Sequence, residues 1–305
     1  MMNAAEIRSV SGILSPERLG LYALRAMLEE VYTTPKPGLV DILTQGAHTD
    51  MDVHTFEKSA SAICPYFTEM ACAGADPMLP PSDLFPTIRR IGRDAELAMY
   101  RATGGVNTHK GLIFALGLFV TAASRLTACG MRVTAESLQM TEQSICARTL
   151  EKELLQMKFG RMGCASARDN VTHGLDNLRR YGTSGARGEA IGGYPSVFYC
   201  ALPVMLEGIR EHRNWNRIKL QTLLALMAET DDSNILSRTD PDTLHEVQQD
   251  MKNFLQSGGA YRRDAYVTLT EMDRLYSERR ISAGGCADLL AVSIFLMMIL
   301  EKPAA

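Results

Sequence analysis

The segment TGGVNTHKG, residues 103–111, gathers flexible backbone, hydroxyl, imidazole and ammonium groups in one short turn before an apolar stretch. Gly104 and Gly105 allow positive φ and close approach of the backbone to a ligand. Lys110 and the N–H groups that begin the next helix can neutralise phosphate oxygens. The spacing is not that of a Walker loop. The turn, with Asn107 inside it, predicts a phosphate-binding site, and an ordinary helix start is the alternative.

Two upstream segments carry groups of the same kind. TPKPGLVD, residues 34–41, is a sharp non-helical excursion that carries Lys36, a second candidate for phosphate binding. GAHTDMD, residues 46–52, alternates acidic and imidazole side chains, so an extended backbone would turn them to one side. Carboxylate oxygens at this spacing suit Mg²⁺, and capping of the following helix is the alternative. The candidate residues in this segment are His48, Asp50 and Asp52.

Three further segments lie in the second half of the chain. YGTSGARGEAIGGYPS, residues 181–196, holds Arg187, a bidentate phosphate donor, and Glu189 between tight turns, and a surface ion pair is the alternative. ETDDSNILSR, residues 229–238, offers oxygen ligands for a hard cation or caps for a helix. SAGGCADLL starts an apolar helix, where anion binding or close helix packing would explain the glycines. The candidates in ETDDSNILSR are Asp232, Asn234 and Arg238.

The elements that must position these segments are predicted to be helices. Ser15, Pro16 and Glu17 form a typical helix start, and convincing strand alternation is missing. Helical patterns cover residues 16–32, 53–72, 86–102, 109–128, 134–157, 195–211, 215–230, 241–256, 262–279 and 286–301. The sequence therefore predicts one all-α domain over residues 1–305, with glycine-rich interhelical loops that form the active-site cleft.

Composition excludes several classes of protein. With 305 residues, 46% hydrophobic and 22% charged, the chain can bury a substantial core. A net charge of −3 without basic runs gives no basis for nucleic-acid binding. Seven cysteines without CxxC pairs predict reduced thiols in the cytoplasm. No secretory signal is expected, and the apolar stretches 112–120 and 289–300 fall short of the roughly 20 residues of a membrane span. These stretches are predicted to be buried helices.

Six segments, in this order, resemble the triphosphoribosyl-dephospho-coenzyme A synthases. They are EVYTTPKPGLVD, GAHTDMD, TGGVNTHKG, YGTSGARGEA followed by GYPSV, DDSNILSR and GGCADLLA. The resemblance spans most of the chain and implies a helical transferase that joins ATP to 3′-dephospho-coenzyme A with release of adenine. The implied product is the prosthetic-group precursor of citrate lyase or malonate decarboxylase, which a carrier-protein transferase would receive.

The implied reaction is a glycosyl transfer, in which the ribose 2′-hydroxyl of dephospho-coenzyme A displaces adenine at the anomeric carbon of ATP. Carboxylates near that carbon would stabilise its positive charge, and one could accept the hydroxyl proton. The catalytic candidates are His48, Asp52, His109 and Glu189, of which Glu189 could instead orient Arg187. The candidate Mg²⁺ ligands are Asp50, Asp52, Asp232 and Asn234. The substrate-binding candidates are Lys36, Gly104, Gly105, Asn107, Lys110, Arg187 and Arg238.

Three positions depart from the family pattern. Ile42 stands in place of a basic residue, Leu175 in place of a carboxylate, and the Thr239–Asp240 pair in place of glycines that would follow Arg238. Two other functions stay open at this point. A Mg²⁺-dependent hydrolase of N-glycosidic nucleotides would use the same groups with water, and a nucleotide-binding regulator would release no adenine. No motif specifies an oligomeric state.

Overall fold

A computed structural model of the protein describes residues 14–159 and 185–300, and every regular element within these ranges is helical. The all-α prediction is confirmed. The elements are α1 (Pro16–Val31), α2 (Val53–Ala75), α3 (Pro81–Thr103), α4 (Lys110–Ala128), α5 (Ala135–Phe159), α7 (Gly185–Gly192), the π-helix η2 (Ser196–Ala201), α8 (Leu202–Arg210), α9 (Trp215–Glu229), α10 (Ser233–Arg238), α11 (Pro241–Gln256), the 3₁₀-helix η3 (Gly259–Tyr261), α12 (Ala265–Glu278) and α13 (Gly284–Ile299).

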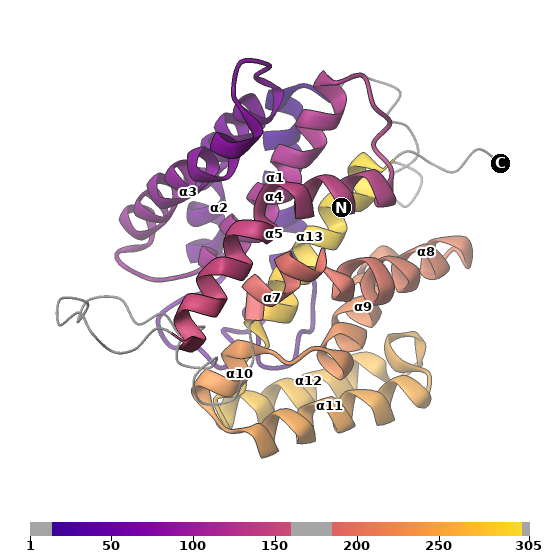
Figure 1. The fold of residues 1–305 in the computed structure, drawn as a ribbon. Helices are drawn as coiled ribbons and strands as arrows, with labels where there is room; N and C mark the ends of the chain where they lie inside the picture. Colours follow the sequence, from indigo (N-terminus) through magenta and orange to yellow (C-terminus); the bar gives the residue numbers. More distant parts are fainter. Residues whose placement is uncertain (1–13, 160–184, 301–305) are drawn as a thin grey trace.

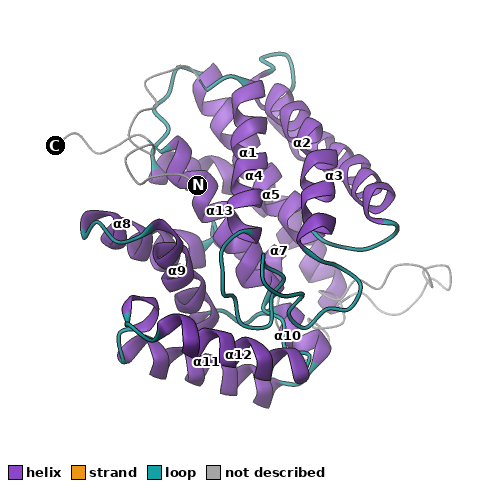
Figure 2. Cartoon of the chain, turned by 180° about the vertical axis from the view of Figure 1, so that it is seen from behind, coloured by secondary structure: helices purple, strands orange, loops and turns teal. Residues whose placement is uncertain are grey.

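Helix α13 joins two groups of helices (Figure 1). In the first group α2 packs against α1, α3 and α4, and in the second α9 packs against α8 and α11. Because α13 contacts α1, α4 and α9, the two groups share one continuous apolar core that runs from Leu14 to Ile299. The long loops that follow α1 and α3 gather near the start of α13 when the molecule is seen from behind (Figure 2).

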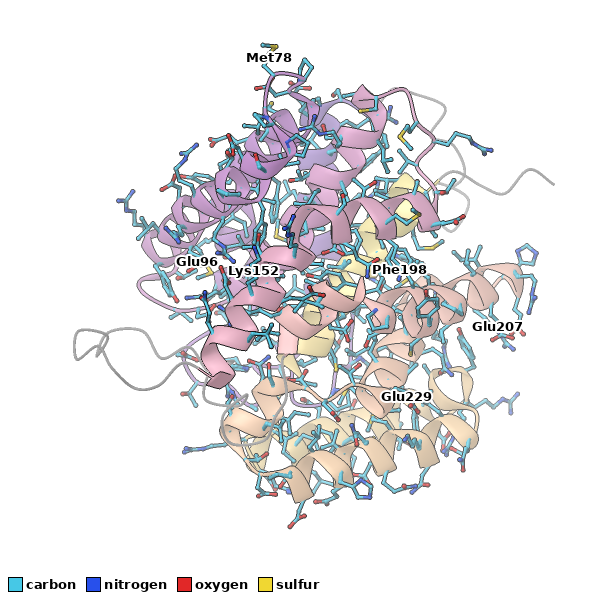
Figure 3. All side chains as sticks on the ribbon, viewed as in Figure 1. Met78, Glu96, Lys152, Phe198, Glu207 and Glu229 are labelled. Atoms are coloured by element: carbon cyan, nitrogen blue, oxygen red, sulfur yellow. The ribbon has the colours of Figure 1, made fainter. Side chains whose placement is uncertain are left out.

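The two most apolar predicted stretches are core helices, as expected. Helix α4 is long and apolar enough to cross a membrane by length and composition, yet 72% of its most apolar window is buried inside the fold. It packs against α2, α5 and α13, which explains its composition. Figure 3 shows the contrast between core and surface, with Phe198 turned inward and Met78 projecting from the α2–α3 loop at 84% exposure.

Proline and capping residues set several helix boundaries. The Ser15 hydroxyl accepts a hydrogen bond from the Arg18 N–H at 3.3 Å and Pro16 occupies the first turn, as the sequence predicts. The prediction was wrong at the start of α3, which begins at Pro81 rather than at residue 86. Pro81 supplies the first helical position, and Pro86 is accommodated inside the helix. Two short helices, α7 and α10, were missed because their sequences are rich in glycine or capping residues.

A buried polar cluster lies between α5 and the segment that follows α7. The Glu142 carboxylate accepts a hydrogen bond from the Cys146 thiol at 3.1 Å, while Glu142 Oε2 and the Tyr194 hydroxyl have no hydrogen-bond partner in the described structure. Burial raises the pKa of Glu142 from 4.5 to about 8. The carboxyl group is therefore protonated in the folded protein at neutral pH.

Glu142 is expected to make the folded state less stable as pH rises. Its raised pKa means that the folded state binds more protons than the unfolded state between pH 4.5 and about 8. Stability should fall across this window by on the order of 5 kcal/mol, since each pKa unit corresponds to about 1.4 kcal/mol. Glu142→Gln should flatten the fall, which urea unfolding at pH 6 and pH 9 would measure. An unchanged slope in the variant would contradict the assignment.

Candidate active site

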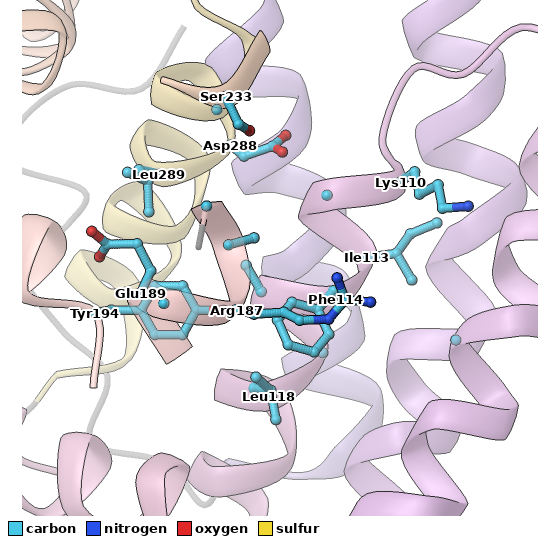
Figure 4. Close-up of a pocket in the computed structure, with 18 of the residues that line it drawn as sticks. Lys110, Ile113, Phe114, Leu118, Arg187, Glu189, Tyr194, Ser233, Asp288 and Leu289 are labelled. Atoms are coloured by element: carbon cyan, nitrogen blue, oxygen red, sulfur yellow. The ribbon is translucent and has the colours of Figure 1, made fainter. Parts of the chain in front are cut away.

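One large cleft opens among α3, α4, α7, α10 and α13, with a cavity volume of about 1510 Å³ (Figure 4). Typical sites for a single small ligand measure roughly 300–1,000 Å³, so this cleft has room for two nucleotide-sized molecules. Of the predicted site residues, those that line it are Gly105, Asn107, Lys110, Arg187, Glu189, Asp232 and Asn234. The remaining candidates, Lys36, His48, Asp50, Asp52, Gly104, His109 and Arg238, do not line it.

The turn before α4 has the backbone that its glycines predict. Gly104 has φ 68° and Gly105 has φ 97°, and a Cβ at either position would meet no atom within 4 Å. Backbone conformation, rather than packing, therefore explains both glycines. The Asn107 side-chain oxygen accepts a hydrogen bond from the Lys110 N–H at 3.2 Å, while Lys110 Nζ pairs with Glu96 of α3 at 3.0 Å. Lys110 accordingly points away from Asp288 (Figure 4).

Arg187 extends from α7 toward the α4 side of the cleft (Figure 4). It is half-buried and has no hydrogen bond or ion pair with any residue that the structure describes. Glu189 points in another direction, because its carboxylate accepts hydrogen bonds from the Ser196 hydroxyl at 2.7 Å and the Ser196 N–H at 3.3 Å. Burial raises the pKa of Glu189. Ser196, rather than Arg187, therefore holds this carboxylate in place.

Asp288 is a cleft residue that the sequence-based candidates missed. It lies in the second turn of α13, is partly exposed to the cleft, and has no hydrogen-bonding partner among residues 14–159 and 185–300. Burial raises the pKa of Asp288 well above its usual range, and the negative charges of Glu30 and Asp232 raise it further. The available signal was its position one turn inside the helix that SAGGCADLL begins.

Gly111, in the first turn of α4, leaves the space that Asp288 occupies. A Cβ at Gly111 would overlap Asp288 Oδ2, so even alanine requires the carboxylate to move. We expect Gly111→Ala to displace the Asp288 carboxylate while α4 stays folded, and a displacement of this kind at a site that acts on a ligand costs about 10-fold or more in rate. Steady-state kinetics with circular dichroism would measure both effects. In an Asp288→Ala background the same glycine substitution should have no further effect, and an additive loss would contradict this explanation.

The Asp232 carboxylate links the starts of α10 and α13 through hydrogen bonds to backbone N–H groups of both helices. Its Oδ1 accepts hydrogen bonds from the N–H groups of Asn234 at 2.7 Å and Ile235 at 3.3 Å, and its Oδ2 accepts one from Cys286 N–H at 2.8 Å. Burial raises the pKa of Asp232. A Cβ on Gly285 would lie 3.0 Å from Asp232 Oδ2, so close packing explains this glycine. Asp232 and Asn234 both line the cleft, and the buried Asp232 carboxylate is held by these three backbone hydrogen bonds.

A second polar cluster joins the loop after α1 to α10. His48 Nε2 lies 3.0 Å from Ser282 Oγ, Arg238 Nη2 donates to His48 Nδ1 at 3.3 Å, and Asp50 Oδ1 lies 3.8 Å from the same nitrogen. Burial, followed by the charge of Arg238, lowers the pKa of His48 to about 4. His48 is therefore neutral at pH 7. This cluster adjoins the cleft, because the Arg238 guanidinium interacts electrostatically with Asp232, which lines the cleft.

The departures from the family pattern do not disturb this cluster. Thr239 has φ −133° and Asp240 has φ −149°, so neither position requires glycine. The Asp240 carboxylate instead caps α11. Ile42 is 47% exposed, which explains why its identity can vary, and Leu175 lies outside the described residues.

Asp52 and Lys36 have structural partners away from the cleft. Asp52 Oδ1 accepts hydrogen bonds from both the N–H and the hydroxyl of Thr55 at 2.8 Å, forming a capping box at the start of α2. Lys36 is buried, and its ammonium group forms an ion pair with Glu30. Neither side chain faces the large cleft in this arrangement.

His109 is buried at the start of α4, just behind the cleft. Its Nδ1 lies 2.7 Å from the Ser59 hydroxyl, and its Nε2 has no partner among the described atoms. Burial, followed by the charge of Lys36, lowers the pKa of His109 to about 3. The imidazole is therefore neutral at physiological pH.

Residues 16–304 match the family model described as ATP:dephospho-CoA triphosphoribosyl transferase. This chain belongs to that family. The protein is accordingly a transferase, and the resemblance of its six segments to the triphosphoribosyl-dephospho-coenzyme A synthases is confirmed.

The similarity to curated family members extends over nearly the whole chain. The 2-(5″-triphosphoribosyl)-3′-dephosphocoenzyme-A synthase of Klebsiella pneumoniae is 38% identical over 297 residues, covering 97% of this chain and 95% of the relative. The synthase of the same name from Escherichia fergusonii is 37% identical over 289 residues, covering 94% and 93%. No solved structure matches the chain.

Proposed function

We propose that this transferase moves the 5-triphosphoribosyl group of ATP to the ribose 2′-hydroxyl of 3′-dephospho-coenzyme A and releases adenine. The observation that carries the proposal is the presence of Arg187 and Asp288 in one cleft. Neither has a hydrogen bond or ion pair with any of the described residues. Because ionisable groups without partners in a partly buried site reduce stability, contacts with a ligand explain their presence there.

The triphosphate is assigned to the cation and the N–H groups around α4 and α7. A guanidinium forms two parallel hydrogen bonds with phosphate oxygens, so Arg187 can fix the triphosphate in one orientation. Gly105 of the turn before α4 lines the same cleft as Arg187, and the positive end of the helix dipole favours an anion at the start of α4. These contacts hold the triphosphate while the bond at the sugar breaks.

The carboxylates are assigned to the sugar. As the bond between the anomeric carbon and adenine breaks and the bond to the 2′-oxygen forms, positive charge develops on the ribose, which Asp288 would stabilise. Glu189 would accept the proton of the 2′-hydroxyl, since its burial raises its pKa toward the working pH. The electrons of the broken bond leave with adenine, which takes up a proton.

Mg²⁺ fits the neighbouring wall of the cleft. The described residues contain no group of three or more His, Cys, Asp and Glu side chains arranged for a metal. Mg²⁺ in nucleotide sites commonly uses one or two protein oxygens together with substrate phosphates, and Asp232 and Asn234 are the two proposed ligands that line the cleft. When bound there, the ion would neutralise phosphate charge.

The biological setting follows from the same assignment. The product would be the prosthetic-group precursor of citrate lyase or malonate decarboxylase, and a carrier-protein transferase would receive it. The six described cysteines are free, which agrees with a cytoplasmic enzyme.

Free adenine is the decisive readout. Purified protein would be incubated with ATP and Mg²⁺, with and without 3′-dephospho-coenzyme A, and adenine measured by chromatography. Adenine that appears only with both substrates, together with a coenzyme adduct heavier by a triphosphoribosyl group, would support the transfer. Adenine from ATP alone would support the nucleotide hydrolase instead. Tight ATP binding without adenine would support a regulator.

A further inference from the structure

Glu96 brings a further carboxylate into the cleft, beyond those assigned to the sugar and to Mg²⁺. It lies in α3 on one face with Arg89, Arg93 and Tyr100, at spacings of three or four residues, and all four line the cleft. The carboxylate pairs with Lys110 Nζ, in the first turn of α4, at 3.0 Å, and the two side chains are 29% and 40% exposed. An ion pair this accessible to water contributes little to stability. Its place in the cleft points instead to a role toward a ligand.

Lys110 is held at both of its ends. Its backbone N–H donates to Asn107 Oδ1 at 3.2 Å, and its ammonium group is paired with Glu96. Asn107 and Gly105 line the same cleft, so this lysine and the turn before α4 belong to one wall of it. A lysine side chain that binds a ligand normally loses rotamer freedom. Because Glu96 already restrains the ammonium group, Lys110 has less freedom to lose on binding than a mobile lysine would.

A second ion pair of α3 shows a different arrangement, in which the cation is used by the protein itself. Arg89 donates to both carboxylate oxygens of Glu153 at 2.6 and 3.0 Å, and its guanidinium carbon lies 4.5 Å from the centre of the Phe85 ring. By contrast, an ammonium group has three N–H donors. In the part of the chain that the structure describes, Glu96 is the one partner of Lys110 Nζ. Two donors are left for a ligand.

The charged ends of Lys110 and Arg187 lie on one side of the cleft. Figure 4 shows both toward the right of the view, whereas the carboxylates of Glu189 and Asp288 lie farther to the left. Lys110 Nζ is drawn to its side of the cleft by Glu96, which belongs to α3. This separation of charges suits a substrate whose phosphates meet the cations and whose sugar meets the carboxylates.

We propose that Glu96 is a positioning residue, which holds the ammonium group of Lys110 so that its two remaining N–H donors bind the phosphates of a substrate. This inference rests on the proposed function, because that function brings the phosphate chains of ATP and dephospho-coenzyme A into the cleft. Glu96 itself does not bind the phosphates, since two negative groups repel each other. Its role is exerted through Lys110.

The sign of the effect of Glu96→Ala on binding tests the proposal. Removal of a negative charge from the cleft would by itself strengthen the binding of an anion. Loss of the restraint on Lys110 should instead weaken it, and we expect the Kd to rise about fivefold, in line with the cost of immobilising one side chain. Titration calorimetry with Mg²⁺ and either ATP or dephospho-coenzyme A would measure it. A rise for ATP assigns its triphosphate to Lys110, and a rise for dephospho-coenzyme A assigns its diphosphate. An unchanged or lower Kd for both would overturn the proposal.

A double-mutant cycle separates positioning from a change elsewhere in the cleft. Lys110→Met alone should raise the same Kd about 10-fold to 100-fold, the range for loss of charge-assisted hydrogen bonds. In the Lys110→Met background Glu96→Ala should cause no further rise, because the group that Glu96 positions is absent. Equal losses from Glu96→Ala in the two backgrounds would contradict a role exerted through Lys110.

Glu153→Ala is the matched control. It removes a carboxylate of similar exposure, 26%, from the lining of the same cleft and likewise breaks an ion pair with a neighbouring helix. Neither Kd should rise, and the melting temperature should fall more than in Glu96→Ala, because a two-pronged pair is lost. A rise in Kd equal to that of Glu96→Ala would show a general defect of the cleft and overturn the inference. A wild type that binds both substrates and releases no adenine would overturn the proposed function, while these Kd values would still decide the role of Glu96.

Discussion

Asp288→Asn should abolish most of the activity and at the same time make the folded protein more stable. We expect kcat to fall by about 100-fold to 1,000-fold, the range for loss of one preorganised electrostatic group. The melting temperature should rise by about 2 °C, because asparagine keeps the shape and removes a carboxyl group whose ionisation is disfavoured by burial, Glu30 and Asp232. Adenine release and calorimetry, the latter without nucleotide and Mg²⁺, would measure the two effects.

The opposite signs of the two effects are what distinguish a functional carboxylate from a structural one. Asp232 has a structural contribution whatever it binds, because it accepts three backbone hydrogen bonds, so Asp232→Asn should destabilise the contact between the starts of α10 and α13 even without ligand. Asp83→Asn, at an exposed position outside the cleft, is the matched control and should change neither quantity by more than a small margin. Full turnover by Asp288→Asn, or a clear loss of its stability, would remove Asp288 from the proposed site.

Local patterns in the sequence were sufficient to predict the positions of most of the long helices. Ser15 with Pro16 marks the start of α1, the glycines at 104 and 105 adopt the positive φ that was expected, and the apolar run 112–120 lies within a buried helix. These features depend on neighbours within one or two turns, which a single sequence contains. The errors arose where short-range signals conflict, as at Pro81 and Pro86 of α3.

The site itself depends on contacts between distant segments, which local patterns do not record. The sequence grouped His48, Asp52 and His109 with the cleft because they stand in the conspicuous segments. Their side chains instead contact Ser282, Thr55 and Ser59 respectively. Conversely, Asp288 looks like any polar residue near a helix start, and its relation to Gly111, far away in the chain, appears only in three dimensions. A carboxylate that faces a cleft without a partner has no signature in the sequence.

The second large expected effect concerns Arg187. Its substitution should impair the use of ATP and leave the use of dephospho-coenzyme A nearly unchanged. Arg187→Ala should lower kcat/KM for ATP by about 100-fold, in line with the loss of charge-assisted hydrogen bonds. Arg187→Lys should recover only part of this loss, leaving a deficit of about 10-fold, because an ammonium group keeps the charge but lacks the planar pair of donors. Steady-state kinetics with each substrate varied in turn would separate these effects from changes in the KM for dephospho-coenzyme A, which should be small.

Stability distinguishes this role from a structural one. Since Arg187 has no hydrogen bond or ion pair within residues 14–159 and 185–300, neither substitution should shift the melting temperature by more than about 1 °C without ligand. In the presence of ATP the wild type should gain thermal stability and Arg187→Ala should gain much less, because binding stabilises only the state that binds. Arg210→Lys, on the exposed surface of α8, controls for the loss of a guanidinium elsewhere. An Arg187→Ala protein that ATP stabilises as strongly as the wild type would show that the triphosphate is held by other groups, with the turn before α4 the first alternative.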